Sequence, residues 1–397
     1  MGTHLRGSPP HHRMEVKPAL ETFAKIKVVG IGGSGGAAIN RMVASKVRGV
    51  DFIAINTDAQ ALHHNGSSKK IHIGQTVTRG LGAGMDPDLG RKAAEEDSEQ
   101  IHDALKGADM IFITCGLGGG TGTGASPIVA DLAREVGALT VAVVTKPFSF
   151  EGAQRRAIAD RGLDELVGKV DTIITIPNDR IFQVVDKKTT LLAAFETVDD
   201  VLRQGVQGIS DIITVPGLIN VDFADVRAIM RDAGTALMGI GRGTGEMRAV
   251  DAAKAAIDSP LLEVSIDGAR GILFTISASP NLSMNEVSEA SRVITASADP
   301  NAKIIFGAVI DEALKDEVKI TVVATGFGPS LTKSSAHTQE TGAGRGQGFV
   351  RTTAPSATSR AVFQERHPLP PSREEEAQKA KEEEELEIPA FIRKKMT

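Results

Sequence analysis

Six glycines crowd into the nine residues 116–124, directly after the apolar run 110–115. Glycine loses more backbone freedom on folding than any other residue, so each glycine has an entropic cost. A turn with a purely structural role needs only one or two glycines. A glycine-rich turn between a buried strand and a helix aims several backbone N–H groups at an anion, and the hydroxyls of Thr121 and Thr123 add donors or metal contacts. The pattern predicts a phosphate-binding turn, with a helix that begins at Ala125.

A second glycine-rich stretch, residues 30–35, follows the first apolar run and satisfies the dinucleotide fingerprint G-x-G-x-x-G before a helix. Alone, this fingerprint also fits an ordinary tight turn or a nicotinamide-dependent oxidoreductase in which Asp51 or Asp58 binds the ribose. A third segment, residues 82–87, precedes another expected helix and is placed to cover the far phosphate. Three such segments predict a nucleoside triphosphate. The sequence contains neither G-x-x-x-x-G-K-[ST] nor N-K-x-D, so a different class of NTPase is expected.

Short β-branched runs alternate with Ala-rich amphipathic stretches through the first half of the chain. This alternation predicts a Rossmann-type α/β domain, with a parallel sheet covered by helices on both faces. A long helix is expected over 189–213, and the mixed pattern beyond it predicts a second α+β domain. The expected strands are 26–31, 52–56, 110–115, 139–145, 172–176, 271–276, 303–310 and 318–324, and the other expected helices are 88–105, 126–136, 154–167, 222–232, 247–258 and 284–296.

The expected organisation has six parts. These are a disordered leader over 1–23, a nucleotide-binding domain over 24–188, a central helix over 189–214, a second domain over 215–329, a disordered linker over 330–386 and a terminal peptide over 387–397. The linker has little to bury, and its root-mean-square reach is on the order of 40 Å. The terminal peptide is predicted to bind a groove on a partner, although a solvated charged end is the alternative. Its candidate binding residues are Ile388, Pro389, Phe391, Ile392 and Arg393.

Composition narrows the function classes. A single cysteine, Cys115, excludes an internal disulfide and a multi-cysteine zinc site; we expect it to be a small packed residue. Aromatic residues make up 4% and the formal net charge is −5, which argues against nucleic-acid binding. No apolar run approaches the roughly 20 residues that span a bilayer. We therefore expect a cytoplasmic protein without direct membrane insertion, and we interpret His63 and His64 as part of a solvated loop rather than a metal site.

The run GGGTGTG followed by Ala-Ser-Pro is the signature of the tubulin superfamily, and residues 24–329 resemble its FtsZ family. Further matching stretches are INTD at 55–58, KPF at 146–148, FEG at 150–152, IPND at 176–179, VLRQGVQGI at 201–209, INVDFAD at 219–225 and the peptide at 387–395. The resemblance implies a tubulin-like GTPase that polymerises head to tail into a division ring at mid-cell. It implies GTP or GDP with Mg²⁺ held mainly through the phosphates, and as partners further copies of the chain, a membrane-tethering adaptor and division regulators.

Carried over position by position, the resemblance implies nucleotide contacts in the glycine-rich segments and around the base. These residues are Gly32, Gly33, Ser34, Gly35, Gly36, Ala37, Ala83, Gly84, Gly118, Gly119, Gly120, Thr121, Gly122, Glu151, Arg155, Asn178, Phe195 and Asp199. Phe195 and Asp199 are four residues apart on a helix and share a face, and a carboxylate suits the N–H donors of guanine better than adenine's bare N1. Without the resemblance, Phe195 fits a core position and Asp199 a solvated charge. Gly36 and Ala37 stand where the family usually has Asn, so side-chain amides are lost there.

Hydrolysis is assigned to Asn220, Asp222 and Asp225. From spacing alone, Asp222 is a helix N-cap with Asp225 in the first turn. The resemblance implies instead that this loop enters the nucleotide site of the next subunit and polarises the attacking water. Two carboxylates built permanently beside a triphosphate would repel it, which favours delivery from a neighbour. A filament protein that binds nucleotide without hydrolysing it is the remaining alternative, and the intact NVDFAD segment argues against it.

Overall fold

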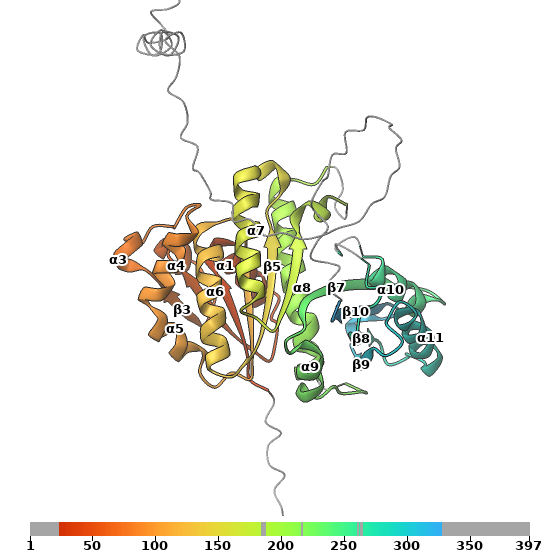
Figure 1. Ribbon diagram of the computed structural model, residues 1–397. Helices are drawn as coiled ribbons and strands as arrows, with labels where there is room; N and C mark the ends of the chain where they lie inside the picture. Colours follow the sequence, from red (N-terminus) through yellow and green to blue (C-terminus); the bar gives the residue numbers. More distant parts are fainter. Residues whose placement is uncertain (1–23, 184–187, 216, 260–261, 263–264, 328–397) are drawn as a thin grey trace, which may run out of the picture. The chain divides into compact units, whose positions relative to one another are not determined.

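The computed structural model describes residues 24–183, 188–215, 217–259, 262 and 265–327, which fall within one compact unit of the chain (Figure 1). Its first six strands are parallel to one another: β1 (Ile26–Ile31), β2 (Val50–Asn56), β3 (Lys69–His72), β4 (Met110–Gly116), β5 (Leu139–Lys146) and β6 (Thr172–Pro177). Central strands such as β4 and β5 are buried on both faces, which explains their near-continuous apolar sequences. The sequence predicts five of these strands and misses β3, whose four residues KKIH are mostly polar.

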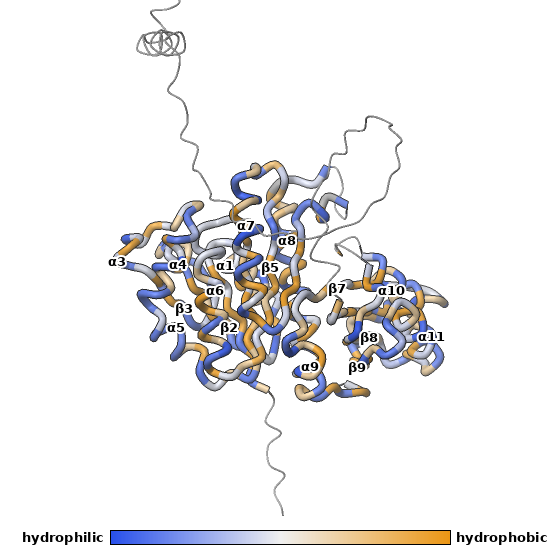
Figure 2. The backbone as a smooth tube through the Cα atoms, viewed as in Figure 1, coloured by the Kyte–Doolittle hydropathy of each residue, from blue (hydrophilic) through white to orange (hydrophobic). Residues whose placement is uncertain are grey.

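Helices cover both faces of the parallel strands. One face packs against α4 (Pro87–Glu96), α5 (Ser98–Leu105), α6 (Gly120–Glu135) and α7 (Ala153–Val167), and the other against α1 (Gly32–Ala44), α8 (Leu191–Thr214) and α9 (Phe223–Met230). Short helices α2 (Ala59–His63) and α3 (Gln75–Thr78) lie in the connections. Figure 2 shows apolar residues concentrated along the strands and hydrophilic ones on the outer sides of the helices. The single helix expected over 88–105 is wrong: it breaks at Asp97, whose Oδ2 accepts a 2.7 Å hydrogen bond from Gly74 N.

The sheet continues into the second half of the chain. Within the described residues the sheet has ten strands in the order β3-β2-β1-β4-β5-β6-β7-β10-β8-β9, and β7 pairs with β6 over three residues. The added strands are β7 (Gly234–Gly243), β8 (Gly271–Ala278), β9 (Lys303–Ile310) and β10 (Val318–Thr325), and α10 (Arg248–Ile257) and α11 (Met284–Thr295) pack on them over a third core. The sequence does not predict β7, because its glycines serve helix packing: a Cβ on Gly239 or Gly241 would overlap carbonyl oxygens of α10.

Helix α8 connects the two halves and runs against the direction of the parallel strands. Its 24 residues correspond to about 36 Å of helix. Near its start, the Phe195 ring meets Phe148, which follows the end of β5. Near its end, Thr214 packs against Gly49, which precedes the start of β2. The helix therefore spans the sheet from one edge to the other, and the two-domain division drawn through it stays a prediction.

Candidate functional site

The carboxyl ends of five parallel strands meet along one edge of the sheet. Ile31 at the end of β1 pairs with Ile55 of β2, Gly116 at the end of β4 with Thr145 of β5, and Lys146 with Pro177 of β6. The segments that follow these strands contain most of the residues predicted to bind a nucleotide. This edge is therefore the candidate site.

Helix α1 begins at Gly32, immediately after β1, so the fingerprint glycines form its first turns. Gly32 has a φ of +72°, a left-handed conformation that glycine adopts without strain. A Cβ on Gly35 would overlap Thr114 O of β4, so this glycine lets the helix pack closely on the sheet. A Cβ on Gly33 would meet nothing within 4 Å. Gly33 therefore leaves the space in front of the helix open for a ligand.

Helix α6 begins at Gly120, so the predicted start at Ala125 is wrong. The glycines responsible for the error let α6 pack against α4 and the segment before it: a Cβ on Gly124 would overlap Pro87 O of α4, and one on Gly120 would lie 2.6 Å from Ala83 O. A Cβ on Gly119 would meet nothing within 4 Å. Glycine density here thus has two causes, helix packing on one side and open space for a ligand on the other.

The segment 82–87 is held against the second glycine turn. Gly120 N donates a 2.7 Å hydrogen bond to Gly84 O, and Thr123 Oγ1 accepts one of 2.9 Å from Gly118 N. Gly120 N and Thr123 Oγ1 therefore both form hydrogen bonds within the protein. The Thr123 hydroxyl stabilises the turn and is not a free metal contact. The amides of Thr121 and Gly122 have no partner within α6, because first-turn amides lack the preceding carbonyls. They are the donors that this turn offers to an anion.

The first turns of α1 and α6 lie side by side. A Cβ on Gly32 would lie 3.0 Å from Gly122 N, and one on Gly116 would lie 2.7 Å from Ser34 Oγ. Neither helix carries an acidic residue in its first turn. Two helix N-termini that converge, with no acidic residue in their own first turns, create a positive electrostatic potential suited to phosphate. Sequence reasoning missed Thr57 here, whose hydroxyl lies 2.7 Å from that of Thr121.

Gly36 and Ala37 lie in the second turn of α1. Asn65 Nδ2 donates a 2.8 Å hydrogen bond to Gly36 O, and a Cβ on Gly36 would lie 3.3 Å from that nitrogen. With Gly33, these residues line a small pocket that also includes Asn56 at the end of β2. The small side chains leave this part of the site open.

An aromatic cluster lies at the other end of the same edge. Phe148 stacks on Phe150 at 5.0 Å between ring centroids and meets Phe195 edge-on at 5.7 Å. Phe195 is 41% exposed, so it does not occupy the core position that its helical spacing also allowed. Asn178, at the end of β6, is 6% exposed, and its Oδ1 has no hydrogen-bond partner among the described residues. A buried polar atom without a partner is costly, and a ligand that donates to it would remove that cost.

Asp199 lies one turn beyond Phe195 on α8. Burial raises the pKa of this carboxyl to about 6, and Glu196 adds to the rise while Arg41 opposes it. Arg41, on α1, forms a 3.5 Å ion pair with Glu196 and so connects the two helices beside the site. Asp199 is therefore a partly buried carboxylate that accepts no hydrogen bond from the described residues, rather than a solvated charge. Sequence reasoning missed Arg41, which nothing in its local pattern singles out.

Glu151 and Arg155 form a pair between the aromatic cluster and the glycine turns. Arg155 Nη1 lies 2.9 Å from Glu151 Oε2, and Glu151 Oε1 accepts a 2.8 Å hydrogen bond from Phe148 N. A Cβ on Gly118 would lie 2.9 Å from Arg155 Cγ, so the arginine covers that glycine. Its Nε is buried without a hydrogen-bond partner in the described structure. The pair lies where a group between a base and its phosphates would be.

The acidic loop lies at the opposite edge of the sheet. Asp222 is the N-cap of α9 and accepts a 3.3 Å hydrogen bond from Ala224 N, and Asp225 lies in the first turn, as the spacing predicted. After α9 the chain runs back to the amino end of β6, where Gly234 N donates a hydrogen bond to Asp171 O. From Phe195 to the end of α8 is about 28 Å of helix. In Figure 1, β5 points toward one end of the sheet and α9 lies at the other end.

Asn220 has a local role as well: its Oδ1 accepts a 2.6 Å hydrogen bond from Gly217 N. The structure thus brings the predicted nucleotide contacts together and leaves Asn220, Asp222 and Asp225 apart from them. The predicted partner-binding residues 388–393 lie outside the described residues, as do the leader and the linker.

Three further observations concern metal ions, the single cysteine and membrane-spanning helices. No group of three or more His, Cys, Asp and Glu side chains is placed to hold a metal ion in the described ranges. Cys115 is fully buried, and burial raises the pKa of its thiol to about 11, so it is a packed residue beneath the glycine turn. Within the same ranges, no helix is long and apolar enough to cross a membrane.

Comparisons with known proteins agree with this geometry. A model described as Tubulin/FtsZ family, GTPase domain, matches residues 25–186, and one described as FtsZ family, C-terminal domain, matches residues 234–328. The chain is similar to an FtsZ dimer from M. jannaschii, with 48% sequence identity, a TM-score of 0.74 and coverage of 77% of this chain and 89% of that chain.

Two CetZ structures from Haloferax volcanii are similar in fold. CetZ2, in a GTPgS-bound protofilament, has 22% identity and a TM-score of 0.66, with coverage of 76% of this chain and 92% of that chain. CetZ1, a GDP-bound monomer, has 20% identity and a TM-score of 0.67, with coverage of 77% and 95%.

Proposed function

The chain belongs to the tubulin/FtsZ family, and from this premise we propose how the two edges of its sheet share one reaction. Membership makes it a GTP-binding GTPase that self-associates into cytoskeletal filaments in cell division. A nicotinamide-dependent oxidoreductase, which the first glycine fingerprint alone allowed, is thereby excluded. The roles of individual residues are our proposal.

The phosphates of GTP bind at the paired N-termini of α1 and α6. The amides of Gly33, Thr121 and Gly122 donate to their oxygens, in front of the open space that Gly33 and Gly119 leave. Ala83 and Gly84 cover the far phosphate. We propose that Mg²⁺ is held mainly through the phosphates, where it would offset their charge. No group of three or more His, Cys, Asp and Glu side chains in the described part of the chain is placed to hold a metal ion by itself.

The base binds at the aromatic end of the site. Phe195 stacks on the purine, and ionised Asp199 accepts from its N1–H and N2–H₂, a pair of donors that guanine has and adenine lacks. Asn178 Oδ1, which has no partner in the described structure, accepts a further hydrogen bond. Glu151 and Arg155 bind the sugar and the adjoining phosphate.

Hydrolysis is completed by the next subunit. The observation that carries this proposal is the separation of the acidic loop from the glycine turns by the length of α8. One chain has the nucleotide site at the carboxyl edge of its sheet and Asp222 and Asp225 at the opposite edge, so head-to-tail stacking joins the two. The carboxylates and Asn220 then polarise the water that attacks the γ-phosphate. Nucleotide turnover therefore requires assembly.

Substituting Asp222→Ala tests this role. We expect GTP binding and filament formation to persist while most hydrolysis is lost, measured as phosphate release above the assembly threshold. Asp311→Ala is the matched control, since Asp311 caps a short helix through the amide two residues on, as Asp222 does. Equal turnover in the two variants would exclude the proposed role of the loop.

The terminal peptide 387–397 is proposed to bind a membrane-tethering adaptor and division regulators at a cytoplasmic ring. Deleting residues 388–397 is expected to leave GTPase activity unchanged and to abolish recruitment to the ring, measured by fluorescence in dividing cells. Activity lost together with the peptide would contradict a tail that works separately from the GTPase.

A further inference from the structure

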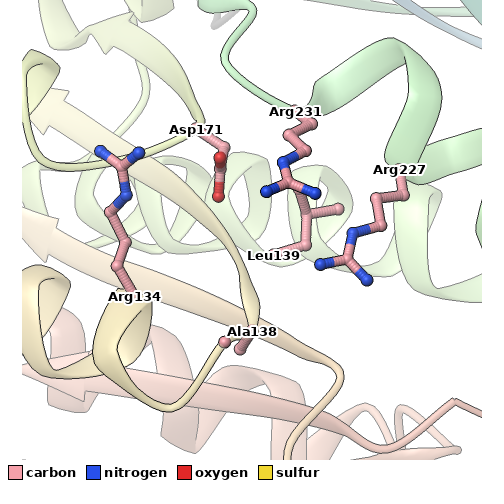
Figure 3. Close-up of a pocket in the computed structure, with 7 residues that line it drawn as sticks. Arg134, Ala138, Leu139, Asp171, Arg227 and Arg231 are labelled. Atoms are coloured by element: carbon pink, nitrogen blue, oxygen red, sulfur yellow. The ribbon is translucent and has the colours of Figure 1, made fainter.

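A pocket rich in arginine lies at the amino edge of the sheet, far from the nucleotide site. It is formed by the end of α6, the start of β5, the residue before β6 and the last turn of α9 (Figure 3). The lining residues are Arg134, Gly137, Ala138, Leu139, Asp171, Arg227 and Arg231. Figure 3 shows the guanidinium groups arranged around one space, with those of Arg134 and Arg231 on either side of the Asp171 carboxylate.

The carboxylates near this pocket do not balance its cations. Asp232 lies 3.3 Å from Arg134 Nη2 and 3.9 Å from Arg231 Nε, with all three side chains substantially exposed. Asp171 is 6% exposed, and its two oxygens accept hydrogen bonds from Thr140 N at 2.8 Å and Asp232 N at 3.4 Å. Its carboxylate is therefore used to hold backbone in place. Three guanidinium groups face two carboxylates, which leaves an excess of positive charge.

Arg227 is the group that this arrangement does not explain. It forms no ion pair or hydrogen bond through its side chain with any described residue, and its Nε is buried. A buried guanidinium nitrogen without an acceptor is costly, because guanidinium is always charged and its N–H groups need acceptors. An anion in the pocket would supply the missing acceptor.

We propose that this pocket binds an oxyanion of the phosphate class. Arginine presents paired N–H donors that fit two oxygens of one phosphate, and three arginines on two helices approach from different directions. A tetrahedral group offers oxygens in several directions, whereas a planar carboxylate offers two. The site is distinct from the GTP site, because it lies at the amino ends of β5 and β6 rather than at their carboxyl ends.

Isothermal titration of GDP-saturated, full-length protein with pyrophosphate, inorganic phosphate and AMP tests the proposal, since GDP occupies the nucleotide site. We expect Arg227→Gln and Arg231→Gln each to weaken binding of the anions about tenfold, the effect of losing one charge-assisted contact. Arg292→Gln, at an exposed arginine on α11, is the control and should bind as the parent does. The best ligand of the three identifies the source, whether free phosphate, a diphosphate or a phosphate monoester.

Anion binding in both pocket variants that equals binding in the parent would overturn the proposal, as would no anion binding in the parent. GDP affinity, measured in the same samples, shows separately whether the GTP site is intact. Thermal melting by circular dichroism confirms that the variants fold. The Arg231 side chain is 63% exposed, so Arg231→Gln keeps the test available if Arg227→Gln does not fold.

Discussion

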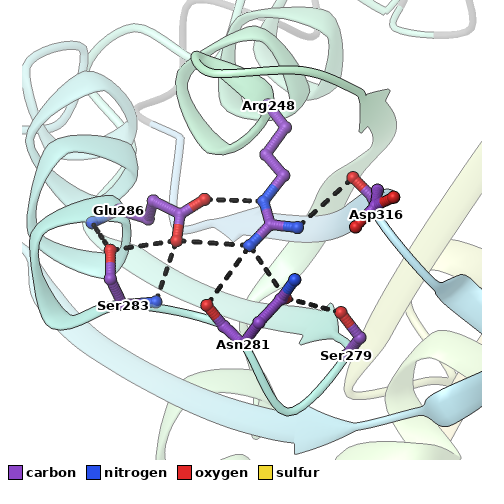
Figure 4. A network of polar contacts seen from close by, with 6 residues as sticks. All are labelled: Arg248, Ser279, Asn281, Ser283, Glu286 and Asp316. Atoms are coloured by element: carbon purple, nitrogen blue, oxygen red, sulfur yellow. Dashed lines mark hydrogen bonds and ion pairs between the residues drawn. The ribbon is translucent and has the colours of Figure 1, made fainter.

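Two buried polar regions of this molecule differ in how fully their hydrogen bonds are satisfied. Beside α10, the Arg248 guanidinium bonds to Glu286 at 2.6 Å, to Asn281 Oδ1 at 3.0 Å and to Asp316 O at 3.3 Å, and Ser283 N donates to Glu286 at 2.8 Å (Figure 4). At the nucleotide edge, Asn178 Oδ1 and Arg155 Nε lack partners among the described residues.

We interpret the difference as that between a region that serves folding and one that serves binding. Arg248 joins three segments of the second half of the chain, so its contacts are formed once, on folding. Asn178 Oδ1 and Arg155 Nε lack partners among the described residues, although Arg155 Nη1 is paired with Glu151, and in our proposal these atoms and the Asp199 carboxylate receive the ligand. Unsatisfied groups cost stability in the ligand-free protein, and our proposal is that this cost is recovered when GTP binds.

Breaking the complete network should have the largest effect. Arg248→Met leaves the Glu286 carboxylate without its main partner in a largely buried place, and we expect a loss of about 3 kcal/mol in the free energy of unfolding. Urea denaturation measures it, and GTP affinity of the folded fraction should not change. Arg242→Met is the control, since the Arg242 side chain is 57% exposed and its pair with Glu317 should contribute less than about 1 kcal/mol. Equal losses in the two variants would refute the contrast.

Removing a group from the incomplete region should act on affinity. Asp199→Ala eliminates the carboxylate that we propose accepts hydrogen bonds from guanine, and we expect affinity for GDP to fall about a hundredfold, while ligand-free stability does not fall. Fluorescent-nucleotide titration and urea denaturation give the two values. Asp200→Ala is the neighbouring control, because Asp200 bonds to Arg203 and Gln204 instead. A comparable affinity loss in both would remove the specific role of Asp199.

The smallest effect is a pH dependence of opposite sign in the two regions. With its pKa raised to about 6, Asp199 takes up a proton as the pH falls through that value, so GDP affinity should fall about tenfold from pH 7 to 5. Asp199→Asn should lack this component. Because the folded pKa exceeds that of the unfolded chain, the ionised carboxyl destabilises the ligand-free protein above about pH 6, and the penalty is relieved as the pH falls.

Glu286 behaves in the reverse way. The hydrogen bond from Arg248 lowers the pKa of Glu286 to about 2, below its ordinary value of 4.5. Its stabilising contribution is therefore present above about pH 4.5 and is lost as the pH falls toward 2. Stability curves of the parent and of Glu286→Gln should converge over that range. Parallel curves would show that the ion pair does not control stability.

Much of the fold could be predicted because the parallel strands are buried on both faces and so have continuous apolar sequences. Prediction failed at the mostly polar strand β3, at the helix break at Asp97 and where glycine serves close packing. Local propensity disfavours glycine in strands and helices. The sequence therefore did not indicate the strand β7 or the first turn of α6, both of which contain several glycines. Only the packing of α10 on β7 and of α4 on α6 explains them.

The sequence could indicate which candidate residues lie together where they follow apolar runs, since such residues gather at one edge of a parallel sheet; their roles stay a prediction. Thr57 and Arg41 were missed because their partners, Thr121 and Glu196, are 64 and 155 residues away in the sequence. The acidic loop was correctly expected to cap a helix. Predicting that this loop lies far from the glycine turns requires knowing how α8 runs across the sheet. No local sequence pattern contains that information.

Mixing two inactive variants tests most directly whether hydrolysis is shared between subunits. Asp222→Ala keeps the nucleotide site, and Asp199→Ala keeps the acidic loop; each alone should turn over little GTP at micromolar nucleotide. In a random equal mixture, about a quarter of head-to-tail interfaces combine one intact nucleotide site with one intact loop. We predict that phosphate release in the mixture rises well above the sum of the separate rates. A mixture that only equals that sum would contradict a site built from two chains.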